Sequence, residues 1–293
     1  MEESPAAGAI VWLGATDCSE PTSVGPKAAQ LSALAAHHPV PAGFCLTAQA
    51  YRSAQPGGHV SAALRTSLSV AYERLRDGTD EDGGYVAVRS SAVDEDGAEA
   101  SFAGQHDTML NVRGLDAVLA AVTSIWASLR SETALAYRRQ RGLAEDDLAL
   151  AVLVQRMVWA DVAGVAFSLD PVTGARERIV VSANWGLGES VVAGTVTADT
   201  WHLDKRDLRV LDVVVADKER MVIPSESGTR SVKVPTFLRT RASLADSALA
   251  RVAELTRSLE RERGWPVDIE FAWRGDELWL LQCRPITVTG THA

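Results

Sequence analysis

The spacing of apolar residues along the chain predicts alternating helices and strands. From Leu115 onward, apolar side chains recur every three or four residues, the period of a helix with one buried face. The same period predicts helices within residues 27–36, 60–76 and 249–259. Short runs rich in β-branched residues predict strands at residues 85–88, 148–154, 162–169, 178–181, 210–215, 267–273 and 277–283. Helices and strands are intermixed, so the expected class is α+β.

A break in this pattern predicts two lobes. A length of 293 residues allows either one large domain or two lobes. A weak turn signal from Asp161 to Gly164 predicts a hinge. This hinge divides the chain into an N-terminal lobe (1–162) and a C-terminal lobe (163–293). The chain shows no internal repeat, so a solenoid is not expected.

Composition narrows the class of protein. The chain is 46% hydrophobic and 23% charged, and no apolar run approaches the roughly 20 residues of a membrane span. Its first residues are acidic where a signal peptide is basic, so we expect a cytoplasmic protein. The net charge of −9 argues against nucleic acid as the main partner. Three cysteines, Cys18, Cys45 and Cys283, lie too far apart to suggest a disulfide framework or a zinc site.

The last two predicted strands form a hairpin with one chemical face. A three-residue loop, Gly275 to Glu277, sets Glu270 opposite Gln282 and leaves apolar residues on the other face. The same register pairs Asp268 with Arg284, Ile269 with Cys283, Phe271 with Leu281, and Trp273 with Trp279. A two-residue loop mixes polar and apolar residues on both faces, so the pattern favours the first register. Opposed carboxylate and amide oxygens about 5 Å apart suit Mg²⁺, although an ordinary solvent-facing hairpin has the same pattern.

Two cations stand where a bound phosphate is expected. Lys27 follows Gly25-Pro26 and opens a predicted helix, so its ammonium group lies near the positive end of the helix dipole. Arg89 stands at the end of an apolar strand and precedes two serines, a setting in which a guanidinium group can bind phosphate oxygens. Taken alone, each residue is more simply a solvated side chain.

Two further segments are candidates for nucleotide contacts. The stretch Ser101 to Thr108 is rich in small and hydroxyl residues, and Gly104 and Thr108 suit a lid over a triphosphate. Gln155 ends a predicted strand and suits a hydrogen bond to an adenine edge. Other nucleotide motifs are absent: Trp185 to Glu189 lacks the third glycine of a dinucleotide loop, and the chain has no Walker or protein-kinase signature.

Taken together, these segments resemble a known family over nearly the whole chain. The chain is similar to the ATP-binding domain of phosphoenolpyruvate synthase, pyruvate phosphate dikinase and rifampicin phosphotransferase. The segments that carry the resemblance, beyond those above, are Pro39 to Phe44, Ala163 to Phe167, Asp170 to Gly174, Trp185 to Glu189 and Leu281 to Ile286.

The resemblance implies an ATP-grasp fold in which two lobes clamp ATP, and a reaction that transfers the β-phosphoryl group. It also implies the role of each candidate residue. Lys27, Arg89 and Arg284 are the phosphate-binding cations, Gly104 and Thr108 form the lid, Gln155 contacts adenine, and Glu270 and Gln282 are the Mg²⁺ ligands. Catalysis by such a site consists of positioning and charge stabilisation.

The chain departs from the family in two respects. Where the family usually has Gly-Gly-Lys-Gly-Ala-Asn, this chain has Gly25-Pro26-Lys27-Ala28-Ala29-Gln30. The proline removes a backbone donor, and the loss of two glycines stiffens the loop. The family also carries a swivelling domain whose histidine follows Thr-Ser-Gly-Gly. No histidine of this chain lies in such a stretch; the six are His37, His38, His59, His106, His202 and His292.

Three hypotheses follow. The first is a stand-alone ATP-binding enzyme component that passes the β-phosphoryl group to a histidine on a separate partner protein, which also carries the acceptor-substrate domain for a small molecule. The second is a kinase or ligase that acts directly on a small molecule and leaves ADP. The third is a non-catalytic nucleotide-binding module, which the stiffened Gly25 to Gln30 loop suggests.

Overall fold

The computed structural model describes residues 8–54, 60–77, 83–92, 108–132, 139 and 149–286. Contacts divide the chain into two compact units. Unit 1 comprises residues 1–37 and 41–157, and unit 2 comprises residues 38–40 and 158–293. The boundary between residues 157 and 158 precedes the one expected from sequence, which would fall inside a strand. The identification of these units with nucleotide-clamping lobes remains a prediction.

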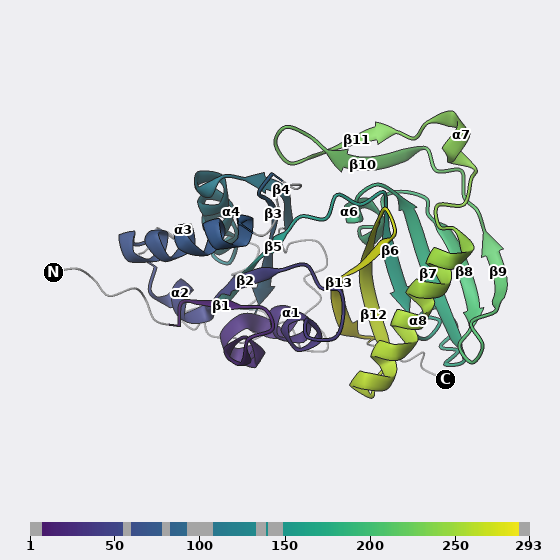
Figure 1. Ribbon diagram of the computed structural model, residues 1–293, viewed down its shortest axis with the longest axis horizontal. Coiled ribbons are helices and arrows are strands. Elements are labelled where there is room, and N and C mark those ends of the chain that lie inside the picture. The colour runs from purple at the N-terminus through teal and green to yellow at the C-terminus, as the bar shows by residue number, and fades with distance from the viewer. Residues whose placement is uncertain are drawn as a thin grey trace. The chain divides into compact units, whose positions relative to one another are not determined.

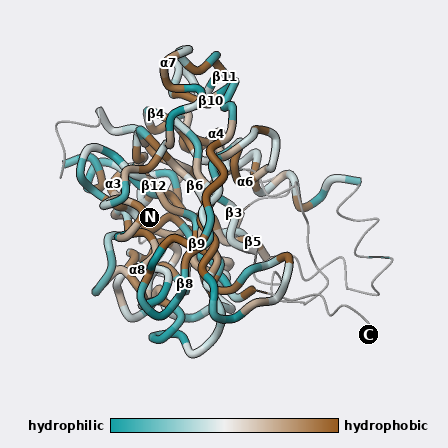
Figure 2. The backbone as a smooth tube through the Cα atoms, turned by 90° about the vertical axis from the view of Figure 1, so that its right-hand side faces the viewer, coloured by the Kyte–Doolittle hydropathy of each residue, from teal (hydrophilic) through white to brown (hydrophobic). Residues whose placement is uncertain are grey.

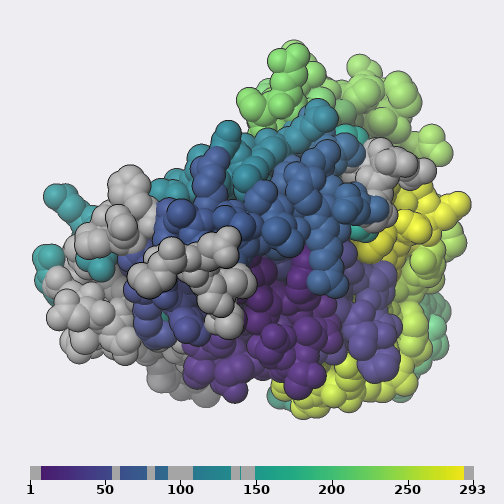
Figure 3. All heavy atoms as spheres, turned by 60° about the vertical axis from the view of Figure 1, so that its left-hand side comes forward, coloured from purple at the N-terminus to yellow at the C-terminus, as the bar shows by residue number. Residues whose placement is uncertain are grey.

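Unit 1 is built on an antiparallel five-stranded sheet (Figure 1). In spatial order its strands are β1 (Ile10–Trp12), β2 (Gly43–Leu46), β5 (Leu150–Arg156), β3 (Tyr85–Ala92) and β4 (Thr108–Arg113). The helical elements are η1 (Thr16–Ser19), α1 (Pro21–Leu34), α2 (Ala48–Arg52), α3 (Ala62–Arg76) and α4 (Leu115–Ser128). Figure 3 shows segments distant in sequence, coloured purple and blue, packed side by side on the surface of this unit.

The two faces of this sheet have different chemistry. Phe44, Val154 and Val88 are neighbours across three strands and point into an apolar core. Buried residues of α3 and α4 complete that core, among them Leu68, Tyr72, Val122 and Trp126. Because side chains alternate along a strand, Arg89 and Gln155 lie on the opposite face. Helix α1 contacts β3 and β5. The thiol of Cys45, which also lies on that face, donates a hydrogen bond to the Val24 carbonyl oxygen of α1.

Unit 2 is built on an antiparallel six-stranded sheet. Its strands, in spatial order, are β13 (Glu277–Pro285), β12 (Val267–Arg274), β6 (Val162–Phe167), β7 (Arg178–Trp185), β8 (Asp199–Asp204) and β9 (Val210–Val214). A separate hairpin is formed by β10 (Arg220–Pro224) and β11 (Thr229–Lys233), and the helices are α6 (Glu189–Val192), α7 (Thr236–Arg239) and α8 (Asp246–Arg263).

Helix α8 covers one face of the second sheet (Figure 1). It contacts β6, β7 and β12, and it buries one stripe of small and apolar residues, including Leu249, Val252 and Leu259. The helix ends at Gly264, which adopts a left-handed conformation that suits glycine. The opposite face of the sheet is only half-buried along the row formed by Glu270, Val165 and Ser182.

A fully buried ion pair connects strand β8 with the segment that precedes β10. Lys218 Nζ lies 2.6 Å from Asp199 Oδ1, and both side chains are 0% exposed. The Asp199 carboxylate also accepts from the backbone N–H groups of Ala216 and Ser243. Charge and hydrogen-bonding capacity are thus satisfied together, which a buried ion pair requires.

Most elements expected from sequence are confirmed, but several strands were missed. The missed strands are β1, β2, β4, β8, β10 and β11. Strand β2 has only four residues, all buried, so it has no alternation to detect. Within the described residues, no helix has the length and apolar character needed to cross a bilayer.

Gly164, which the sequence analysis assigned to a hinge, lies inside strand β6. A β-carbon at this position would lie 2.1 Å from the carbonyl oxygen of Ser182 on β7. Glycine is therefore required here because two backbones approach closely.

Candidate functional site

Unit 2 places the predicted metal ligands directly opposite each other. Glu270 of β12 pairs with Gln282 of β13, as the hairpin pattern predicted. Glu270 is half-buried and Gln282 is 6% exposed. The pairs of Asp268 with Arg284 and of Ile269 with Cys283 are also confirmed.

The register near the turn differs from the prediction. Arg274 pairs with Glu277, so the loop has two residues, Gly275 and Asp276, rather than three. Gly275 has φ 56°, a conformation that suits the tight turn of a two-residue hairpin.

A β-bulge reconciles the two registers. Phe271 pairs with Leu280 and Glu270 with Gln282, so Leu281 is the extra residue of β13. The predicted pairs of Phe271 with Leu281 and of Trp273 with Trp279 are therefore wrong. The bulge shifts the register by one residue and so restores the opposition of Glu270 and Gln282.

Arg284 forms an ion pair within the same hairpin. Its Nε lies 2.7 Å from Asp268 Oδ2, and the Arg284 side chain is 60% exposed whereas that of Asp268 is 9% exposed. Burial raises the pKa of Asp268, the Arg284 charge opposes this shift, and Glu270 adds to it. The predicted phosphate-binding cation is thus held by a buried carboxylate and remains accessible.

The donor set of this hairpin fits a hard cation that keeps other ligands. Glu270 and Gln282 supply carboxylate and amide oxygens from adjacent strands, the type of ligand that Mg²⁺ takes alongside water and phosphate. Among the described residues, no group of three or more His, Cys, Asp or Glu side chains is arranged to hold a metal ion.

Unit 1 places Lys27 beside the strand that carries Arg89. Helix α1 begins at Pro21, earlier than expected, and is interrupted at Gly25, which has φ 75° and ψ 155°. Lys27 therefore lies at the start of the second part of this helix. Lys27 Nζ donates to the Ser90 carbonyl oxygen at 3.1 Å, and the backbone N–H of Ala28 donates to Ser91 Oγ at 3.2 Å.

Arg89 and Thr108 are direct neighbours across β3 and β4. Arg89 is 8% exposed, so its guanidinium group is largely removed from water. Gly104, the other predicted lid residue, lies outside the described residues.

Gln155 is buried on the same face of the sheet. Its side-chain amide donates to the Pro41 carbonyl oxygen at 3.1 Å, and the residue is 2% exposed. This contact links β5 to the segment before β2. The adenine contact assigned to Gln155 by resemblance stays a prediction.

Ser91, one of the two serines that follow Arg89 in the sequence, contacts the helix that carries Lys27. It is 0% exposed, and its hydroxyl accepts a hydrogen bond from the second part of α1. The sequence pointed to Ser91 only through its position directly after Arg89-Ser90. The contact between Ala28 and Ser91 joins residues far apart in the chain, so it leaves no periodic pattern in the sequence.

Hydrogen bonds connect the segment from Trp185 to Glu189 with the β10–β11 hairpin. Leu187 N–H donates to the Val222 carbonyl, and Glu189 accepts from Thr229 Oγ1 at 2.8 Å. A β-carbon on Gly186 would lie 2.2 Å from the Val222 carbonyl oxygen. The glycine therefore permits close packing of the hairpin.

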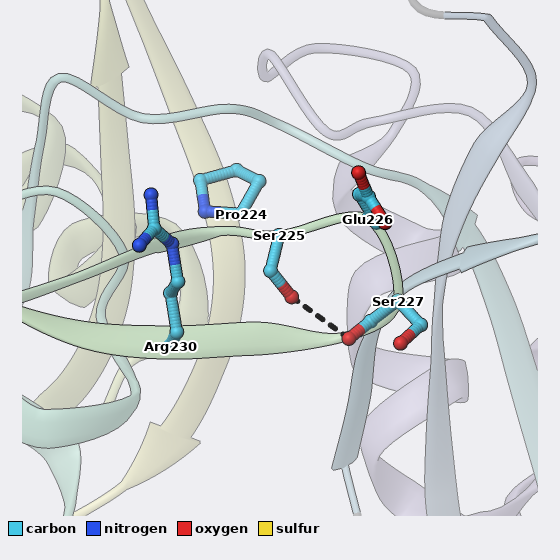
Figure 4. Close-up of a pocket in the computed structure, with 5 residues that line it drawn as sticks. All are labelled: Pro224, Ser225, Glu226, Ser227 and Arg230. Carbon is cyan, nitrogen blue, oxygen red and sulfur yellow. Dashed lines mark hydrogen bonds between the residues drawn. The ribbon is translucent and has the colours of Figure 1, made fainter.

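Two surface hollows lie away from the predicted residues. One, of about 560 Å³, surrounds the turn of the β10–β11 hairpin (Figure 4), where Ser225 Oγ donates to the Ser227 carbonyl and Arg230 lies beside Pro224. The other, of about 570 Å³, lies between β1 and α3 in unit 1 and is lined by Trp12, Val70 and Arg74. Neither hollow contains a predicted site residue.

Comparison with known proteins identifies relatives of this chain. Residues 52–293 match the model of a family described as pyruvate phosphate dikinase, AMP/ATP-binding domain. The chain is 40% identical to a probable phosphoenolpyruvate synthase of Methanocaldococcus jannaschii over 76% of its length, and 41% identical to the prodigiosin synthesizing transferase PigC of Serratia marcescens over 95%. It is 38% identical to rifampicin phosphotransferase of Bacillus subtilis over 69%.

These relatives are much longer proteins. The matched region is 19% of the Methanocaldococcus protein, 33% of PigC and 23% of the Bacillus protein. The chain therefore corresponds to one part of each relative.

Proposed function

The chain belongs to the family of pyruvate phosphate dikinase AMP/ATP-binding domains, and from this premise we propose that it binds Mg-ATP and passes the β-phosphoryl group to a histidine of a separate partner protein. The named relatives include a rifampicin phosphotransferase and a probable phosphoenolpyruvate synthase, so ATP-dependent phosphoryl transfer is the reaction class that membership favours. The fold expected for this activity is an ATP-grasp fold with ATP between two lobes.

The proposed chemistry uses the cations of both units. Lys27 and Arg89 bind phosphate oxygens from unit 1, and Arg284 binds them from unit 2. Thr108, opposite Arg89, and Gly104 close over the triphosphate. The support for these roles is the proximity of Lys27 to the Arg89 strand and the pairing of Arg89 with Thr108.

In this proposal Glu270 and Gln282 would hold Mg²⁺, which would supply charge neutralisation and polarisation at the phosphates. Asp268 orients Arg284 in the same hairpin through their ion pair, and Glu270 is half-buried.

The transfer breaks the bond between the α- and β-phosphates. A ring nitrogen of the partner histidine attacks the β-phosphorus, AMP leaves with the bridging oxygen, and the histidine receives the pyrophosphoryl group. Hydrolysis of the γ-phosphate then releases inorganic phosphate and leaves a phosphohistidine. That group goes on to a small molecule bound by the partner.

The single observation that carries this proposal is the opposition of Glu270 and Gln282, which the bulge at Leu281 creates in a chain of this family. The test is to incubate the chain with ATP labelled at the β-phosphate and a protein that carries a swivelling histidine domain. We expect AMP and labelled histidine in equal amounts. ADP as the only nucleotide product would overturn the proposal in favour of direct transfer to a small molecule.

A second candidate is a non-catalytic nucleotide-binding module. It is favoured by the contacts of two proposed cations within the chain: Lys27 with the Ser90 carbonyl, and Arg284 with Asp268. Tight Mg-ATP binding in calorimetry, together with no nucleotide turnover in the presence of the partner, is the outcome that this candidate predicts.

A further inference from the structure

The two edges of the six-stranded sheet of unit 2 have different surroundings. At one edge, all five residues of β9 are exposed, and the strand is mainly the brown of hydrophobic residues in Figure 2. The other edge is β13, where the backbone N–H of Leu280 donates to the Pro39 carbonyl oxygen at 2.9 Å. A segment from the region just before β2 therefore lies against β13.

Residues 38–40 form a short strap on unit 2. Contacts assign these three residues to unit 2, whereas residues 37 and 41 on either side belong to unit 1. Pro39 and Pro41 each have a fixed φ and restrict the residue before them, so the backbone of the strap is stiff. The Val40 N–H donates to the His38 carbonyl oxygen at 2.8 Å, which closes a three-residue turn. The Pro39 carbonyl group thus reaches β13 from a restricted segment.

His38 ties the strap to helix α8. His38 Nε2 lies 2.7 Å from Glu262 Oε2, and the two side chains are 11% and 39% exposed. An ionised carboxylate can only accept a hydrogen bond, so His38 is the donor. Helix α8 also contacts β13. Burial raises the pKa of Cys283 on β13 to about 12, Arg263 opposes this shift, and the Glu262 charge adds to it. The strap and α8 therefore hold the same strand and are joined to each other.

The strap contacts β13 directly before the bulge that sets the candidate metal site. Leu280 pairs with Phe271, Leu281 is the extra residue, and Gln282 then pairs with Glu270. A bulge leaves its extra residue unpaired and locally disrupts the ladder, so contacts outside the ladder help to fix where the bulge lies. The hydrogen bond from Leu280 to the strap is such a contact, one residue away from the bulge.

We propose that the strap holds the Leu281 bulge in place and that His38 is therefore a positioning residue for Gln282. If the bulge is lost, the register set by the turn continues, and Leu281 faces Glu270 in place of Gln282. The candidate ligand pair is then separated. This inference rests on the proposed function for its effect on Mg²⁺ binding, whereas its effect on the backbone of β13 is independent of that function.

Amide hydrogen exchange at Leu280 tests the effect on β13. We expect His38→Ala and Glu262→Ala each to speed this exchange at least about tenfold, the factor that corresponds to loss of a hydrogen bond to a charged group. His38→Gln should restore slow exchange, because a glutamine amide can also donate to Glu262. The amide of Val181 on the central strand β7 is the internal reference for global unfolding, and its exchange should not change.

Glu254→Ala is the matched control for Glu262→Ala. Glu254 is also on α8, its side chain is 46% exposed, and it forms an ion pair with Arg261 at 3.1 Å. The variant therefore removes a charge and an ion pair from the same helix without touching the strap. We expect exchange at Leu280 to be the same as in the unmodified chain.

Calorimetry of ATP binding with and without Mg²⁺ tests the effect on the candidate metal site. We expect His38→Ala to weaken Mg-dependent binding about tenfold, at the lower end of the losses seen when a group that holds a metal ligand is removed. Binding of ATP without Mg²⁺ should be unchanged, since only Gln282 is displaced. A general loss of stability would instead weaken both. His38→Gln and Glu254→Ala should bind as the unmodified chain does.

Unchanged exchange at Leu280 in both His38→Ala and Glu262→Ala would overturn the proposal. Faster exchange with undiminished Mg-dependent binding would also overturn it, because the strap would then support the strand without positioning Gln282. An unmodified chain that binds no Mg-ATP would refute the proposed function instead, and the exchange at Leu280 would still decide whether the strap holds the bulge.

Discussion

Gly25 lies so close to Ser91 that no larger residue fits between α1 and β3. A β-carbon on Gly25 would lie 2.3 Å from Ser91 Oγ and 2.3 Å from the Ser91 carbonyl oxygen. The contact coincides with the interruption of α1, just before Lys27. It therefore fixes the turn that carries Lys27 against the strand that carries Arg89.

Gly25→Ala should destabilise unit 1 more than the same change at Gly114. The two glycines share a backbone conformation, with φ and ψ of 75° and 155° at Gly25 and of 88° and 148° at Gly114. Alanine costs about 1–3 kcal/mol of strain at either position. Gly114 has open space around it, whereas Gly25→Ala must also displace Ser91. Urea unfolding of both variants measures the difference, and equal losses would show that the close contact is unimportant.

Glu270→Gln should weaken Mg-dependent ATP binding at least about tenfold, or about 1.4 kcal/mol. The substitution removes the only carboxylate of the proposed ligand pair and preserves the size of the side chain. Calorimetry with and without Mg²⁺ measures the effect. Glu277→Gln is the control, because Glu277 is exposed in the turn region of the same hairpin. Equal affinity for both variants would remove Glu270 from the metal site.

Lys218→Met should lower the free energy of unfolding by about 3–5 kcal/mol, because it leaves the Asp199 carboxylate charged and buried without its cation. Arg65→Ala provides the comparison. It breaks an ion pair with Asp116 of similar length, 2.6 Å, in which the side chains are 54% and 88% exposed, so we expect a loss of about 1 kcal/mol or less. Chemical denaturation of the two variants measures the two losses of unfolding free energy. Equal losses would show that the buried pair does not stabilise the fold more than the exposed one.

Asp170 should make the stability of the chain fall in acid. Burial raises the pKa of this carboxyl, but hydrogen bonds from Thr173 and Val172 outweigh it, and the pKa is lowered overall from its usual 3.8. A lowered folded-state pKa contributes stability above pH 3.8, and this contribution is lost as pH falls through the folded-state value. The gap in unfolding free energy between wild type and Asp170→Asn should therefore be largest near neutral pH and should shrink in acid. A gap that does not change with pH would contradict this assignment.

The hydrophobic pattern was sufficient for several segments that bury one face, but it missed β8, in which buried and half-buried residues alternate. The helix from Leu115 onward follows from apolar residues at every third or fourth position. The pairing of Glu270 with Gln282 follows from alternation along the two strands, since burial of one face fixes which residues point together. Strand β2 was missed because all of its residues are buried, and β10 and β11 were missed because they bury few.

The candidate site was predicted from sequence as separate residues. Arg89, Thr108, Glu270, Gln282 and Arg284 were chosen from residue chemistry and resemblance. Their pairings within each unit were read from the structure, apart from those in the terminal hairpin. The bulge at Leu281 could not be predicted there, because the turn and the hydrophobic pattern favour registers that differ by one residue.

Residue patterns were enough to predict the α+β class, most of the helices and strands, and the polar face of the last hairpin. The order of the strands, the contact of Gly25 with Ser91, the burial of Lys218 with Asp199 and the exposure of β9 became visible only in the folded chain. The two sets differ in range along the chain. Periodicity reports which side of a segment avoids water, whereas these contacts depend on which distant segment, if any, packs against that side.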